Sequence, residues 1–223
     1  MEDFGGGMIR RPRQGGIRNN QIIDSLEIMA ENRALFLPEQ IDSDVSLIIS
    51  DLRVLASESK KPIKIEIVSY GGEIAWVLAL YHTMSALNNS GVPIYTVGHV
   101  CYSGAALILA AGARGYRYLY PEGIAMIHAT SLTVEGKIGQ ADMKIVKKND
   151  KIFIDLFCKL CRRPDAERKN LFKKLVDDGE EMWFDANEAM DFDLVDGIVT
   201  PEIDRQLFGN LDIPTIETKK KAQ

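Results

Sequence analysis

The chain has 223 residues, of which 46% are hydrophobic and 26% charged, a composition typical of a soluble globular domain with a sizeable core. Its net charge is -5 and its pI about 5.3, which argues against a protein that clamps nucleic acid over its whole surface. No apolar run approaches a membrane span, and three cysteines make no disulfide framework, so we expect a reducing compartment, most simply the cytoplasm.

The two ends of the chain lack the periodicity of packed elements. Residues 1–20 are rich in Gly and Arg, and we interpret them as a flexible N-terminal arm without the apolar segment of a secretory signal. Residues 201–223 are interpreted as a loosely held C-terminal tail, although Leu207, Phe208 and Leu211 are candidates for docking. One domain is therefore expected over residues 21–200.

Strands and helices are predicted to alternate through the first two thirds of this domain. Asp42 is expected to cap a helix that runs to about Ser57 with an apolar stripe. The elements that follow are a strand at 63–68, a helix at 73–87, a strand at 93–98, a helix at 104–111 and a strand at 123–130. This order implies right-handed crossovers and a largely parallel sheet, so the fold class is α/β.

The last third begins with an extended segment at 131–139 and a long amphipathic helix at 140–160. Ile145, Ile152, Phe153 and Leu156 are expected to face the core, and lysines the solvent. The remaining predicted elements are a helix at 166–175, a short helix with a capping box of Asp185 and Glu188, and a final strand within 194–199.

Ser103 raises the main functional question, because its hydroxyl stands between a strand and a helix of small and apolar residues. One interpretation is an N-cap, a position at which Ser is common. The other is a nucleophile whose oxyanion is stabilised by the N–H groups of the helix N-terminus. The lipase-type G-x-S-x-G pattern is absent, because Cys101 and Ala105 replace its glycines.

A serine nucleophile needs a base and an orienting group. His128 follows an apolar strand and is the leading candidate base, whereas His99 is a rival and His82 lies within a helix. In a parallel sheet, the carboxyl ends of the strands bring Gly71-Gly72, Ser103 and His128 to one edge. The acidic candidates for the third group are Asp177, Asp178, Glu180 and Glu181.

Other ligand motifs are missing or weak. The pair Gly71-Gly72 is neither a dinucleotide fingerprint nor a Walker loop, although it permits close backbone approach. Cys158 and Cys161 form C-x-x-C, but the chain offers no second such pair for zinc, so we interpret them as structural. We therefore expect no metal and no organic cofactor.

Several motifs together resemble one family. "SYGG" after a strand, "GHVCYSGAALILAAGARGYRYLYPEG", "MIHAT", "GKIGQAD" and "WFDANEAMDFDLVDGIV" are similar, in order and spacing, to the proteolytic subunits of Clp proteases, the ClpP family of serine peptidases. The resemblance covers about residues 35–199. It implies the ClpP/crotonase-like fold of repeated β-β-α units, with a handle of strand plus long helix at about 131–161.

The resemblance also implies roles for individual residues. Ser103 matches the family's nucleophile and His128 the histidine of its M-I-H motif, while Gly72 and Gly104 match the amides of the oxyanion hole. The third catalytic position falls on Glu181, and Asp178 is the alternative. Family members form two stacked heptameric rings around a chamber, and an ATP-driven unfoldase feeds polypeptide substrates into it. The resemblance thus implies a serine endopeptidase that acts as a homo-oligomer, without nucleic acid or membrane.

The sequence departs from the family pattern at several positions, which makes it a divergent member. Tyr70 replaces the proline of S-P-G-G, one extra residue precedes Ser103, and Glu181 replaces the usual Asp. Lys64 and Glu66 occupy positions where aromatic residues often line the unfoldase-docking pocket. Two alternatives therefore stay open: a catalytically impaired structural subunit of a mixed ring, and a crotonase-like acyl-CoA enzyme.

Overall fold

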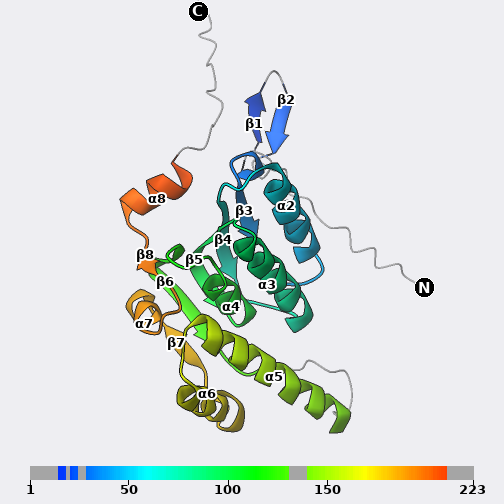
Figure 1. Cartoon of the computed structure of the whole chain (residues 1–223), viewed down its shortest axis with the longest axis vertical. Helices are drawn as coiled ribbons and strands as arrows, with labels where there is room; N and C mark the ends of the chain where they lie inside the picture. Colours follow the sequence, from blue (N-terminus) through cyan, green and yellow to red (C-terminus); the bar gives the residue numbers. More distant parts are fainter. Residues whose placement is uncertain (1–14, 19–20, 25–28, 131–139, 210–223) are drawn as a thin grey trace, which may run out of the picture.

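The computed structural model describes residues 15–18, 21–24, 29–130 and 140–209. Its centre is a six-stranded sheet in the order β3-β4-β5-β6-β7, with β8 paired to β6 outside this path. All neighbouring strands run parallel except β6 and β7, which are antiparallel. The α/β class with a largely parallel sheet is confirmed, and Figure 1 shows helices α2 to α4 side by side along it.

The elements of the structure follow the predicted order closely. The strands are β1 (Gly15–Arg18), β2 (Gln21–Asp24), β3 (Ala34–Leu37), β4 (Ile63–Ser69), β5 (Ile94–Tyr102), β6 (Arg117–Ile127), β7 (Met182–Phe184) and β8 (Gly197–Ile198). The helices are α2 (Val45–Glu58), α3 (Ile74–Asn89), α4 (Gly104–Ala110), α5 (Gln140–Leu160), α6 (Asp165–Phe172), the π-helix η1 (Lys173–Asp177), α7 (Ala186–Asp191) and α8 (Pro201–Phe208).

The alternation of β4 shows how the sheet separates two environments. Ile63, Ile65 and Ile67 are fully buried in the main core together with α3 and α4. Lys64 and Glu66 alternate with them and point to the other face, where α8 lies against the sheet. The carboxyl ends of β4, β5 and β6 therefore share one edge, as the sequence predicts.

One predicted helix start and one predicted face need correction. The first long helix begins at Val45 with Asp44 rather than Asp42 at the N-cap, because the Asp42 carboxylate accepts the Asp44 amide within the preceding turn. Ile145 is 57% exposed instead of facing the core. Figure 1 shows the reason: α5 projects beyond the sheet, so this part of the helix has little of the same chain to pack against. The extended segment predicted at 131–139 lies outside the described residues.

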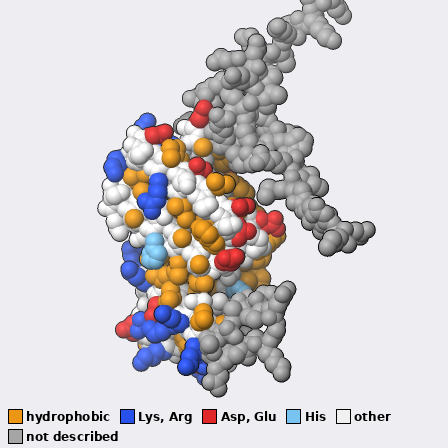
Figure 2. All heavy atoms as spheres, turned by 90° about the vertical axis from the view of Figure 1, so that its right-hand side faces the viewer, with side chains coloured by type: hydrophobic (Ala, Val, Ile, Leu, Met, Phe, Trp, Pro, Cys, Tyr) orange, Lys and Arg blue, Asp and Glu red, His pale blue; other side chains and the backbone are white. Residues whose placement is uncertain are grey.

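The exposed part of α5 carries both charge and apolar surface. Lys144, Lys147 and Lys148 are exposed, and so are Met143 and Ile145. Figure 2 shows hydrophobic side chains among charged ones on the face to which this helix contributes, with Lys and Arg gathered at its lower end. These two apolar side chains on a projecting helix are accessible for contact with another chain.

Parts of both predicted tails have defined structure. Residues 15–18 and 21–24 form an antiparallel hairpin, although we assigned residues 1–20 to a flexible arm. Residues 201–208, which we assigned to the C-terminal tail, form α8, capped by the Thr200 hydroxyl. Leu207 is 7% exposed and packs in a second cluster with Val97 and Val199, so its predicted docking is confirmed. Leu211 lies outside the described residues.

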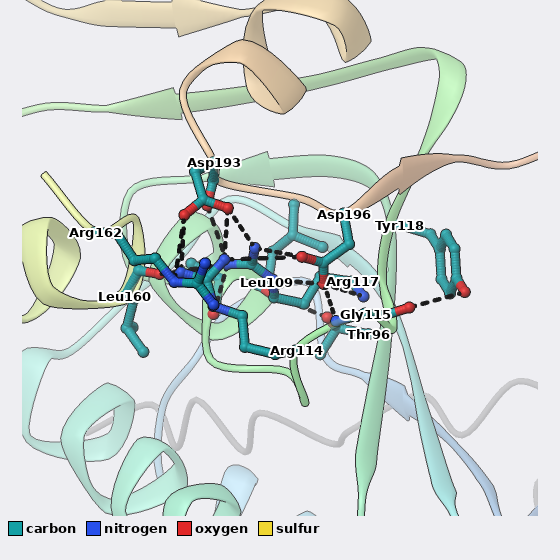
Figure 3. A network of polar contacts seen from close by, with 11 residues as sticks. Thr96, Leu109, Arg114, Gly115, Arg117, Tyr118, Leu160, Arg162, Asp193 and Asp196 are labelled. Atoms are coloured by element: carbon teal, nitrogen blue, oxygen red, sulfur yellow. Dashed lines mark hydrogen bonds and ion pairs between the residues drawn. The ribbon is translucent and has the colours of Figure 1, made fainter.

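A buried arginine joins three distant segments at the end of the sheet away from the predicted site (Figure 3). Arg117 is fully buried, and its guanidinium donates to Asp193 and to Asp196, the latter at 2.7 and 2.8 Å. It also donates to the backbone carbonyls of Ala110 and Leu160 at the ends of α4 and α5. The sequence interpretation missed this network, which ties the last elements of the domain to its core.

Candidate active site

Ser103 occupies a strained turn between β5 and α4. Its backbone has φ 54° and ψ −121°, a region that non-glycine residues rarely adopt. Its amide donates to the Met126 carbonyl at 2.7 Å, which holds the turn against β6. The side chain makes no cap hydrogen bond, so the helix-cap interpretation lacks its defining contact. Strain of this kind clusters at functional sites, and a sharp strand-to-helix turn is the geometry that exposes a serine nucleophile.

The Gly-Gly pair packs directly against this turn. A side chain at Gly71 would lie 2.7 Å from the Tyr102 carbonyl oxygen and 2.9 Å from the Gly104 nitrogen, so only glycine fits there. A side chain at Gly72 would lie 2.2 Å from the Ile41 carbonyl oxygen. No hydrogen bond between described residues uses the Gly72 amide, and the Gly104 amide is an orphan donor at the start of α4.

His128 is the histidine that the fold brings to Ser103. It follows β6 directly, and both residues line one pocket together with Gly72, Ile74, Val77, Gly104, Thr130 and Phe153. The two rivals lie elsewhere. His82 is exposed on α3, and His99 pairs with Glu66 at 2.8 Å and stacks on Tyr120. The predicted Ser103, His128, Gly72 and Gly104 therefore share a single pocket.

Within the described parts of the chain, the Ser103 and His128 side chains line the same pocket without a hydrogen bond between them. Catalytic hydrogen bonds are often longer or less well aligned when no substrate is bound, and they tighten in the complex. The arrangement provides a nucleophile and a base for base-assisted attack on a carbonyl.

Glu181 lies just before β7 and outside the pocket lining. Ile127 and Met182 form the last pair of the antiparallel β6 and β7, so His128 and Glu181 each lie one residue beyond the paired strands. The Glu181 side chain is exposed, and its Oε2 accepts a hydrogen bond from the Trp183 indole at 3.1 Å rather than from His128. Asp178, the alternative, is exposed at the end of η1. Glu181 is thus one residue from the last β6–β7 pair, whereas Asp178 is four residues from it.

The comparisons with known proteins agree with this architecture. A family model described as Clp protease matches residues 17–202, most of the chain. The chain belongs to the Clp protease family. This membership confirms the predicted ClpP-type serine peptidase, and neither the impaired-subunit nor the acyl-CoA alternative is favoured.

Similar proteins carry names of the same kind. ATP-dependent Clp protease proteolytic subunit 1 of Rhodopirellula baltica is 29% identical over 180 residues, covering 78% of this chain and 74% of that protein. The ATP-dependent Clp protease proteolytic subunit of Carsonella ruddii is 28% identical and covers 82% and 92%, respectively. Proteolytic subunit 2 of Mycolicibacterium paratuberculosis is 29% identical over 195 residues, which are 86% of this chain and 93% of that protein. Identities this low are consistent with a divergent member.

One departure from the Clp pattern has a clear structural consequence. Lys64 and Glu66, at the implied docking positions, are engaged within the chain. The Lys64 ammonium donates to the carbonyl of Leu207 in α8 and lies over the Phe208 ring, and burial lowers the pKa of this lysine. The Tyr120 hydroxyl donates to Asp204 of α8 at 2.6 Å. Helix α8 thus covers the sheet face beside both positions.

The cysteines have the structural role that the sequence indicates. Cys158 and Cys161 are both at most 2% exposed, and burial raises their pKa values to about 11 and about 12. Cys101 is also fully buried, and burial raises its pKa. Thiols of this kind stay protonated and make poor nucleophiles. Across the described residues, no group of three His, Cys, Asp or Glu side chains is arranged to hold a metal ion.

One polar residue near the pocket was missed. Asp150 of α5 is 2% exposed, and its Oδ1 accepts the Thr130 amide at 2.6 Å. Its spacing to Phe153, Ile154 and Phe157, three, four and seven residues on, places it on the buried stripe of α5. An acidic residue on an apolar helix stripe is a signal that could have revealed it.

Within the described ranges, no helix has both the length and the apolarity needed to cross a bilayer.

Proposed function

We propose that this chain is the proteolytic subunit of an ATP-dependent Clp-type protease, a serine endopeptidase that cleaves unfolded polypeptides to short peptides. The observation that carries the proposal is the strained Ser103 turn, which shares one pocket with His128 between the Gly72 and Gly104 amides. The family match supports the reaction class. We place this activity in the cytoplasm, where a protein of reduced cysteines is stable.

The reaction that this pocket supports is acyl transfer to Ser103 followed by hydrolysis. The Ser103 oxygen attacks the peptide carbonyl while His128 takes the hydroxyl proton, and His128 then gives that proton to the departing amine. Water releases the acyl group by the same steps in reverse. The Gly72 and Gly104 amides are the proposed donors to the oxyanion of each tetrahedral intermediate. This chemistry requires no metal and no organic cofactor.

The proposed orienting group for His128 is Glu181. Its position next to Met182, the partner of Ile127 in the last β6–β7 pair, supports this choice over Asp178. For Glu181 to hold the imidazole, its carboxylate must leave the Trp183 indole and rotate toward the neighbouring strand. The longer side chain of Glu relative to Asp gives the reach for this rotation.

The proposed assembly is a homo-oligomer of two stacked heptameric rings served by an ATP-driven unfoldase. The names of the similar proteins, which describe proteolytic subunits of an ATP-dependent protease, support an oligomer with an ATPase partner. The exposed Met143 and Ile145 on the projecting α5 fit a surface buried between subunits. An unfoldase that docks beside Lys64 must displace α8 or bind elsewhere on the ring.

A second candidate function is a structural subunit with impaired catalysis. Its one specific support is that the Glu181 carboxylate accepts the Trp183 indole rather than His128. The family match and the names of the similar proteins do not favour it. The two functions differ in whether the assembled protein turns over peptide by itself.

Turnover of a short fluorogenic peptide by the assembled protein tests the proposal, with particle size measured in the same sample. We expect Ser103→Ala and His128→Ala to lower kcat by about 10³-fold or more, and Glu181→Ala to lower it further than Asp178→Ala. His82→Ala is the matched control, because this exposed histidine lies outside the pocket. A correctly assembled wild-type ring without activity would establish the structural subunit instead.

A further inference from the structure

Asp150 contacts the segment that carries the histidine of the pocket. This carboxylate of α5 is 2% exposed and accepts the Thr130 amide at 2.6 Å. Thr130 lines the same pocket as Ser103 and His128. Burying a carboxylate is costly unless hydrogen bonds compensate, so an acidic side chain here needs a reason that packing does not supply.

The hydrogen bond between Asp150 and Thr130 lies just beyond the last pair of β6 and β7. Pairing between β6 and β7 extends to Ile127, so residues 128–130 lie beyond the paired strand. Asp150 ties this short segment to α5, and the same helix supplies Phe153 to the pocket wall. Hydrogen bonds to a carboxylate are shorter and stronger than neutral ones. Fixing the Thr130 amide therefore restricts the backbone that carries the imidazole.

We propose that Asp150 is a positioning residue for peptide hydrolysis. By holding the Thr130 amide, it keeps the backbone of residues 128–130 in the conformation from which His128 reaches Ser103. The proposal rests on the proposed function, in which His128 is the general base. It assigns Asp150 no proton transfer and no contact with the substrate. The role requires an acceptor oxygen at this position, whereas a negative charge is dispensable.

Three variants of the full-length assembled protein separate this role from others. Asp150→Asn keeps an acceptor oxygen at the same place, whereas Asp150→Leu has a similar size and no acceptor. We expect Leu to lower kcat about 10²-fold with KM changed less than about threefold, and Asn to restore kcat to within about threefold of wild type. Asp155→Leu is the matched control, because Asp155 lies on the same helix and pairs with the exposed Lys151.

Hydrogen exchange provides a readout that does not depend on turnover. In the assembled protein, the peptide that contains Thr130 is expected to exchange faster in Asp150→Leu and at the wild-type rate in Asp150→Asn. If the wild-type protein shows no peptidase activity, the proposed function fails, and the exchange data still decide whether Asp150 holds this segment.

Three results would overturn the proposal. One is wild-type kcat in an assembled Asp150→Leu protein, and another is an Asp150→Asn protein as defective as the Leu variant. The third concerns assembly, because Asp150→Leu is at risk of not folding. Asp150→Ala, which admits water to the site, is then the second test. Failure of both variants to assemble, while Asn assembles normally, would make Asp150 a folding residue only.

Discussion

Replacing Arg117 with methionine tests how the end of the domain is held to its core. Arg117 is fully buried and pairs with Asp193 at 3.1 Å and Asp196 at 2.7 Å. Methionine keeps a long unbranched side chain but removes every donor. Asp196 then loses its main counter-charge and Asp193 loses the second of its two arginine partners. The carbonyls of Ala110 and Leu160 also lose a hydrogen bond. The cost is therefore that of an ion pair broken by removing one partner.

Removing one partner of a buried ion pair costs about 3–5 kcal/mol. For a chain of 223 residues, each kcal/mol lowers the melting temperature by about 2–4 °C. We therefore expect Arg117→Met to melt about 6–20 °C below wild type at pH 7.

The stability lost in Arg117→Met should be larger at neutral pH than at acidic pH. Burial by itself would raise the pKa of Asp196, but the hydrogen bonds and charge of Arg117 outweigh it and hold that pKa below its usual value. Asp193 follows the same pattern, with Arg114 as its strongest partner. A lowered folded-state pKa stabilises the protein above the unfolded value of about 4 and loses this effect as pH falls through the folded value. The gap between wild type and variant should therefore narrow below about pH 4.

Scanning calorimetry at matched scan rates provides the measurement, with particle size checked before each run. Arg205→Met is the control, since Arg205 and its partner Glu202 form an exposed pair, and such pairs contribute about 0–1 kcal/mol. An Arg117→Met protein that melts within about 2 °C of the Arg205→Met protein would refute the reasoning, because it would mean that the network contributes no more than a surface pair.

Three further predictions follow from the geometry of the site and of α8. Gly72→Ala should abolish peptide turnover because its side chain meets the Ile41 carbonyl. Gly91→Ala carries the strain of a positive φ but has open space, so it should keep turnover in the same assay. Ser103→Gly should be more stable than Ser103→Ala by about 1–3 kcal/mol, although both are inactive, because glycine relieves the positive φ; equal melting temperatures would contradict this. Tyr120→Phe removes the hydrogen bond to α8 and should speed hydrogen exchange of residues 201–208; unchanged exchange would show that apolar packing alone holds the helix.

Local patterns were enough for much of the fold. The helix at 140–160 and the capping box at Asp185 were predicted correctly, because periodicity and capping residues lie within one stretch of sequence. Placing Ser103 and His128 at one edge required only the rule for parallel strands. The face of Ile145 was predicted wrongly, since an amphipathic pattern cannot reveal where a helix leaves the body of the domain.

The missed features depend on contacts between distant segments. Arg117 binds carboxylates 76 and 79 residues further along the chain, a pairing that no local pattern encodes. Asp150 is visible in the sequence as an acidic residue on an apolar helix stripe, but its partner is a backbone amide, which no residue type indicates. The antiparallel β7 has three residues, too few for a strand pattern, yet it pairs with the end of β6 that leads into His128. Chemistry-bearing residue types were thus easier to find than the groups that position them.

The backbone conformation at Ser103 also predicts which substitution would accumulate there if the serine hydroxyl were no longer needed. Glycine adopts a φ of 54° without the steric cost that serine bears, so a single substitution there would make the subunit more stable while silencing it. Glycine would then be favoured, because it increases stability and selection would no longer oppose the loss of activity. Serine at this position is the residue expected of a lineage that still uses its hydroxyl, and the same turn makes glycine at this position the expected mark of an inactive descendant.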